Sequence, residues 1–114
     1  MLVKRDDSGK FTYTPLSNIT QRSPINDIVV TESNSGKTVI AGGNLYQSEI
    51  ETGRADAGIG NIFNVASGAL QHVDFKDMPF LLKGDVKSLE VIKVKGEDYL
   101  LVGRNKGALQ AFKI

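Results

Sequence analysis

The pattern of apolar and polar positions predicts β-strands along most of the chain. Short apolar or alternating runs recur, and turns rich in glycine, asparagine, serine and charged residues separate them. No segment of ten or more residues carries the apolar stripe of an amphipathic helix. The chain is therefore predicted to be all-β and antiparallel. The expected strands are Phe11–Thr14, Ile25–Thr31, Thr38–Ala41, Asn61–Ala66, Ala69–Phe75, Val86–Val94, Tyr99–Val102 and Ala108–Ile114.

A long polar stretch, residues 42–60, interrupts this pattern between two predicted strands. Connections of this length are uncommon in a small domain and are often functional. Leu45 and Ile50 give the stretch apolar anchors, which favours an ordered loop. We expect a recognition surface formed by Asn44, Tyr46, Glu49, Glu51, Arg54 and Asp56. The alternative is that these residues brace the loop, with Arg54 paired to a carboxylate and Tyr46 packed.

The chain also contains an internal repeat. Residues 28–44 align with residues 89–105 without a gap, at a constant offset (89 − 28 = 61). Further along, residues 60–62 align with residues 107–109 at a smaller offset (107 − 60 = 47). The first copy is therefore expected to carry an insertion whose length is the difference between the offsets (61 − 47 = 14), and this insertion is the long polar stretch.

The repeat suggests how the single β domain, residues 1–114, is organised. Residues 8–14 resemble residues 67–73, so a lone fourth strand is expected at 8–16. A complete four-stranded unit then spans 24–75, and a unit without its fourth strand spans 84–114. Successive four-stranded sheets that cannot bury their faces alone are typical of propeller blades. We expect about two blades of an incomplete β-propeller, with homo-oligomers forming through exposed blade edges; a small barrel or sandwich is the alternative.

Composition excludes several classes of function. The net charge of +1, without a dense basic run, argues against binding of nucleic acid. The absence of cysteine excludes disulfides and thiolate chemistry. No apolar run is long enough to cross a bilayer, so no membrane span is expected. The N-terminal residues lack the apolar core of a signal peptide.

Candidate catalytic residues are few. His72 is the only histidine and lies in a predicted strand, where a packed or solvated side chain is the favoured interpretation. No Gly-x-Ser-x-Gly elbow accompanies it. Glu49, Glu51 and Asp56 could supply the paired carboxylates of a glycosidase, which is the alternative function. We predict no catalytic residue, no cofactor and no enzymatic activity.

Three segments carry a family resemblance. Ile25–Val30, the turn Ser35–Lys37 and Val39–Asn44 together resemble the FG-GAP/VCBS repeats of β-propeller proteins. The stretch 43–57, with residues 84–87 and 100–105, looks like the C-terminal region of large bacterial VCBS-repeat proteins related to the ASPIC/UnbV group.

The resemblance implies a propeller on secreted or outer-membrane proteins and a role in binding or adhesion. FG-GAP turns bind Ca²⁺ through alternating Asp and Asn residues. The matching turn here, Thr31–Gly36, holds one carboxylate, so no metal is expected. The resulting prediction is a non-enzymatic binding or scaffold module, a fragment of an exported bacterial propeller that contacts protein or carbohydrate. Its location would be extracytoplasmic, with the leader absent from this chain.

Overall fold

The computed structural model describes residues 1–44 and 58–114, and strands dominate these residues. The strands are β1 (Leu2–Arg5), β2 (Phe11–Thr14), β3 (Ile25–Ser33), β4 (Gly36–Gly43), β5 (Asn61–Ala66), β6 (Ala69–His72), β7 (Val86–Val94), β8 (Glu97–Arg104) and β9 (Gln110–Lys113). Two short 3-10 helices, η1 (Asn18–Gln21) and η2 (Phe75–Asp77), precede β3 and β7. Within the described residues, no helix has the length and apolarity to cross a bilayer.

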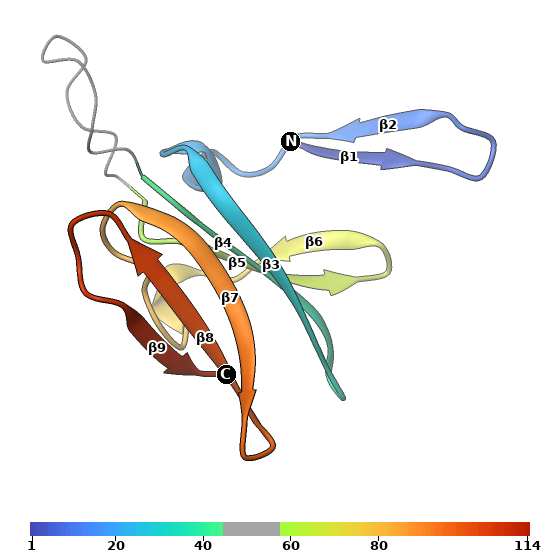
Figure 1. Ribbon diagram of the computed structural model, residues 1–114. Coiled ribbons are helices and arrows are strands. Elements are labelled where there is room, and N and C mark those ends of the chain that lie inside the picture. The colour runs from blue at the N-terminus through green and yellow to red at the C-terminus, as the bar shows by residue number, and fades with distance from the viewer. Residues whose placement is uncertain (45–57) are drawn as a thin grey trace, which may run out of the picture.

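All strand pairs of the described residues are antiparallel, which confirms the all-β prediction. They form a hairpin β1-β2, a middle sheet β3-β4-β5-β6 and a third sheet β7-β8-β9. In Figure 1 the third sheet lies on one side of the middle sheet, and the β1-β2 hairpin lies on the other. The strand expected alone at 8–16 is therefore the second strand of a hairpin. Sequence reasoning missed β1 because Lys4 and Arg5 interrupt its short apolar run.

The middle and third sheets repeat one another at the offset found in the sequence. The register of β3 on β4 recurs in β7 on β8, including a bulge after the first paired residue of β3 and of β7. Two asparagines join the open ends of these hairpins in the same way. The main-chain N–H of Asn44 donates to the carbonyl of Pro24 (3.1 Å), and the main-chain N–H of Asn105 donates to the carbonyl of Asp85 (2.8 Å). The repeat inferred from 28–44 and 89–105 thus has a structural counterpart.

The pairing register of the next strand, β5 in the first copy and β9 in the second, corrects the expected length of the insertion. Ala41 pairs with Asn61, whereas its equivalent, Val102, pairs with Gln110. The offset after the hairpin is therefore larger than the sequence alignment indicated (110 − 61 = 49), and the insertion is correspondingly shorter (61 − 49 = 12, in place of 14). The alignment was wrong by two residues because residues 108–109 still belong to the connection before β9.

One apolar core lies between the middle and third sheets. Burying one such aliphatic side chain stabilises the fold by about 1.5–3 kcal/mol. Gly42 lets the sheets approach closely, because a Cβ there would lie 2.8 Å from Cγ1 of Val86. Phe80 stacks on Phe112 at the outer end, with ring centroids 5.0 Å apart. The buried members are Ile40, Ile62, Phe80, Leu82, Val86, Leu89, Leu100 and Val102.

Candidate functional site

The loop expected to form the recognition surface is only partly described. Tyr46, Glu49, Glu51, Arg54 and Asp56 lie outside the described residues. Asn44, the first residue of the expected surface, and Gly58, which follows the undescribed segment, are both described.

Asn44 is a buried brace at the base of this loop. Its side chain is 1% exposed, and its backbone has a φ of 82°. The side-chain amide donates to the carbonyls of Gly58 (2.8 Å) and Gly84 (2.9 Å), and its oxygen accepts from the amide of Gly58 (3.0 Å). Asn44 thus joins residues 44 and 58 to each other and to the start of β7. At 1% exposure, Asn44 presents almost no surface to solvent.

Two further residues, which sequence reasoning missed, extend this network. The side chain of Asn26 donates to the carbonyls of Asn44 (2.9 Å) and Val86 (2.6 Å). The carboxylate of Asp27 accepts from the amide of Leu89 (2.7 Å). Both residues therefore connect the middle sheet to β7. The available signal was an Asn-Asp pair at the start of an otherwise apolar strand.

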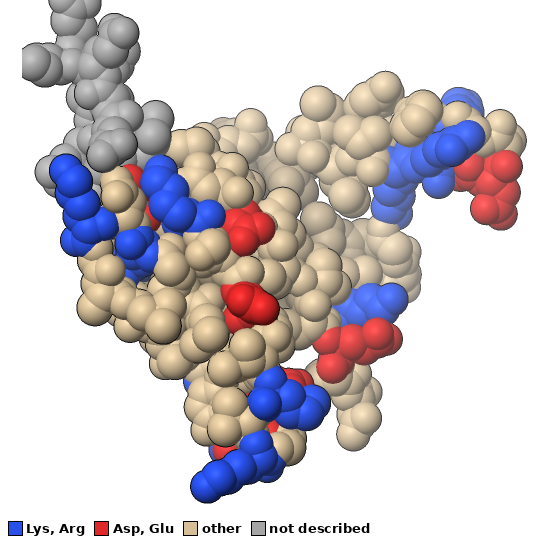
Figure 2. Space-filling model, viewed as in Figure 1, with Lys and Arg blue, Asp and Glu red and all other residues tan. Residues whose placement is uncertain are grey.

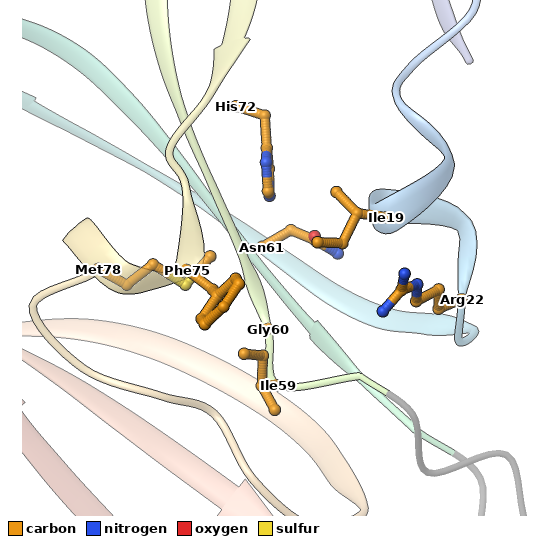
Figure 3. Close-up of a pocket in the computed structure, with 8 residues that line it drawn as sticks. All are labelled: Ile19, Arg22, Ile59, Gly60, Asn61, His72, Phe75 and Met78. Atoms are coloured by element: carbon orange, nitrogen blue, oxygen red, sulfur yellow. The ribbon is translucent and has the colours of Figure 1, made fainter.

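A cavity of about 280 Å³ opens beside the first residues of β5. Figure 3 shows side chains from η1 and the connection after it on one side, and side chains from the η2 region on the other. Ligand pockets usually start at about 300 Å³, so the cavity suits a small group such as one sugar ring or one amino-acid side chain. Its lining residues are Ile19, Arg22, Ile59, Gly60, Asn61, His72, Phe75 and Met78.

The cavity combines three polar groups with an apolar wall. Arg22 brings a positive charge, and Asn61 is a buried amide, 9% exposed. His72 packs against the ring of Phe63 with centroids 5.3 Å apart, and its Nε2 is buried without a hydrogen-bond partner among the described residues. Phe75 is 53% exposed, so its ring is available for stacking. The arrangement can hold a group with an anionic or hydroxyl-bearing edge and an apolar face.

The cavity lining offers cationic, amide, imidazole and apolar groups. The lining contains no carboxylate, so it lacks the acid pair that glycoside hydrolysis requires. Among residues 1–44 and 58–114, no group of three or more His, Asp or Glu side chains could hold a metal ion. The cavity was not predicted because its lining comes from segments that lie far apart in the chain, and only His72 had been considered.

Basic residues gather at the end of the molecule where β7 begins and β8 ends. Figure 2 shows Lys and Arg side chains on this part of the surface. The described segments at this end, 83–87 and 104–106, include Lys87 and Arg104. Lys87 pairs with Asp85 at 2.7 Å, and the Arg104 guanidinium donates to the carbonyl of Ala108. Internal contacts thus engage part of the basic cluster.

The fold places the chain in a broad class: it is an all-β protein built from repeated, stacked antiparallel sheets, and small cavities open among its described residues. No protein-family model matches the chain, and it has no match among curated proteins or solved structures. The FG-GAP/VCBS resemblance therefore remains a prediction drawn from the sequence.

Proposed function

We propose that the chain is a non-enzymatic binding or scaffold module made of propeller-type blades. The identical register and bulge of β3-β4 and β7-β8 support this proposal, as does the face-to-face packing of their sheets. Stacked repeats of this kind are typical of proteins that present extended binding surfaces. The location outside the cytoplasm and the link to exported VCBS-type propellers rest on the sequence resemblance alone.

The cavity is the binding site that this proposal favours, and an acidic saccharide is the ligand class that fits it. The Arg22 guanidinium would pair with a carboxylate of the ligand, and the Asn61 amide would donate to a hydroxyl. Ile59 and Met78 would pack against the apolar face of the ring, and Phe75 would stack on it. The observation that carries the proposal is this pairing of a cation and a buried amide with an apolar wall that holds no carboxylate.

A glycan array that includes uronic-acid and sialylated glycans would test the proposal. Arg22→Ala should weaken binding of the captured glycan at least tenfold, the loss expected from one charge-assisted contact of about 1.5–3 kcal/mol. Lys95→Ala is the matched control, because it removes an exposed cation from the β7-β8 turn, away from the cavity lining. Equal binding by both variants would contradict the proposed site.

The same glycans also test the alternative function, a glycosidase that uses loop carboxylates. The binding proposal predicts that captured glycans are released intact. Hydrolysis that is abolished by Glu49→Gln or Glu51→Gln would replace the binding proposal with the enzymatic one.

A further inference from the structure

The described structure leaves one apolar sheet face open. Three aliphatic side chains of β3 are largely exposed: Ile25 at 44%, Ile28 at 54% and Val30 at 60%. This exposure contrasts with the equivalent positions of β7 in the second copy of the repeat. There, Val86 is 0% exposed, Leu89 is 6% exposed and Val91 is half-buried. The two strands share sequence type and register, so the difference arises from what covers them.

The face of β7 is buried because it packs on the middle sheet. The residues that cover it include Ile40 and Ile62, and Gly42 allows the close approach. Val29, beside Ile40 in the sheet, is partly buried against the same core. The face of β3 would need a cover of this same kind: aliphatic side chains on two paired strands, with a glycine where the sheets meet most closely.

Half of such a cover is already present. In Figure 1 the β1-β2 hairpin lies beside β5 and β6, the outer strands of the middle sheet. Residues of both line a cavity of about 230 Å³. Leu2, Lys4 and Thr14 line it from the hairpin, and Phe63 and Leu70 line it from the middle sheet. In a comparable way, Ile62 of β5 belongs to the core that the middle sheet shares with the third sheet.

The other half of the cover, the strands that would lie over β3, is absent from the described residues. In the middle sheet, β5 pairs with β6 on one edge and with β4 on the other. The equivalent strand β1 pairs only with β2, so its second edge is free among the described strands. By the repeat, a strand paired with this free edge would lie over the exposed side chains of β3. Free strand edges and exposed aliphatic faces are both features of surfaces that accept another sheet.

We propose that the free edge of β1 and the apolar face of β3 together form a docking groove for a β-hairpin of the β3-β4 type on another polypeptide. The second strand of the incoming hairpin pairs with β1. Its aliphatic face covers Ile28 and Val30, and a glycine equivalent to Gly42 sits opposite Ile25. This surface goes beyond the proposed ligand cavity and uses none of its polar groups.

A second copy of the chain does not offer the required face. The face that carries its own Val29 and Ile40 is covered by its own third sheet. The outer face of that third sheet carries Glu90 at the position equivalent to Val29 (29 + 61 = 90), and this residue is exposed. Docking there would bury a carboxylate against aliphatic side chains, which is unfavourable. A separate hairpin with its apolar face uncovered avoids this cost.

The proposal can be tested by adding the hairpin to the full chain. Residues 24–44, followed by residues 106–109, would be placed directly before Met1. In the third sheet, residues 105–109 connect β8 to β9, so Met1 then takes the place of Gln110. We expect a higher urea midpoint and at least about tenfold slower hydrogen exchange at the β1 amides that do not bond to β2. Ile28→Ser should lower the midpoint of the extended chain and leave that of the parent chain nearly unchanged.

The matched control carries Val29→Asp and Ile40→Asp in the added hairpin only, and should behave as the parent chain does. A second form tests docking in trans, using a peptide of residues 24–44 with a cysteine added at each end and oxidised to a disulfide. The main-chain contact between Asn44 and Pro24 places these ends side by side. Saturable binding that Ile28→Lys abolishes and Arg22→Ala leaves unchanged would support the groove and separate it from the cavity.

Two results would overturn the proposal. The first is unchanged β1 exchange in the extended chain together with no binding of the closed peptide. The second is a stable dimer of the parent chain by light scattering that Ile28→Lys dissociates, because the open face would then be covered by a second copy.

Discussion

Truncating Asn44 is the most direct test of how the middle sheet is joined to β7. With the described residues its side chain makes three hydrogen bonds, all to main-chain groups of Gly58 and Gly84, and it is 1% exposed. Asn44→Gly keeps the positive φ of 82° accessible and removes only the side chain. Asn44→Ala removes the same hydrogen bonds and adds the strain of a Cβ in the left-handed region.

The expected losses follow from these contacts. Three lost hydrogen bonds at about 1 kcal/mol each predict that Asn44→Gly lowers the free energy of unfolding by about 3 kcal/mol. The left-handed backbone adds about 1 kcal/mol for Asn44→Ala. Asn105→Ala is the matched control, because with the described residues that side chain makes one hydrogen bond, to the carboxylate of Asp85 at 3.2 Å. Its expected cost is about 1–2 kcal/mol.

Urea unfolding followed by far-ultraviolet circular dichroism would measure these differences. With a slope of about 1.5 kcal/mol per molar urea, Asn44→Gly should lower the midpoint by about 2 M. Asn105→Ala should lower it by only about 0.7–1.3 M. If Asn44→Gly costs no more than Asn105→Ala, then Asn44 is not the brace between the loop ends and β7.

Three further changes probe other contacts. Gly42→Ala should lower the free energy of unfolding by about 1–3 kcal/mol in a urea titration, because its Cβ would lie 2.8 Å from Val86. Asp27→Ala leaves a β7 amide without its acceptor and should cost about 1–3 kcal/mol, while speeding hydrogen exchange at that amide. The hydrogen bond from Ser8 is the largest cause that lowers the pKa of Asp6 below 3.8, and Ser8→Ala should raise that pKa in an NMR titration. Because the folded pKa is the lower one, the stabilising effect of Asp6 on the β1-β2 turn is present above pH 3.8 and is lost as the pH falls through the folded pKa.

The strands were predictable from the local pattern of residues, and the errors in that prediction have local causes. Phe11–Thr14 and Asn61–Ala66 were predicted with the bounds that the structure gives. The first strand, Leu2–Arg5, was missed because its last two residues, Lys4 and Arg5, are charged. Pairing with β2, and not burial, stabilises this strand. The two-residue error in the insertion arose because residues 60–62 and 107–109 both have a glycine followed two positions later by an aliphatic residue, whereas hydrogen-bond register sets the true alignment.

The candidate site was predictable only in part. Asn44 was singled out by its place at the end of the repeat, but its role as a buried brace depends on Gly84, which lies far along the chain at the start of the second copy. Arg22, Asn61 and Phe75 carried no local signal, because none belongs to a motif. They line one cavity only because the connections before and after the middle sheet converge beside β5.

The sequence by itself determined the strands, their order and the repeat, because alternation, turn residues and a constant offset between two copies are all properties of the order of residues along the chain. The tertiary structure decided which faces are covered. Ile28 and Leu89 are equivalent in sequence, yet one is 54% exposed and the other 6%. Burial depends on what packs across a sheet, and a strand's own sequence does not encode its cover. For the same reason, the sequence placed Asn44 at the start of the loop but did not show that its side chain is buried against Gly84.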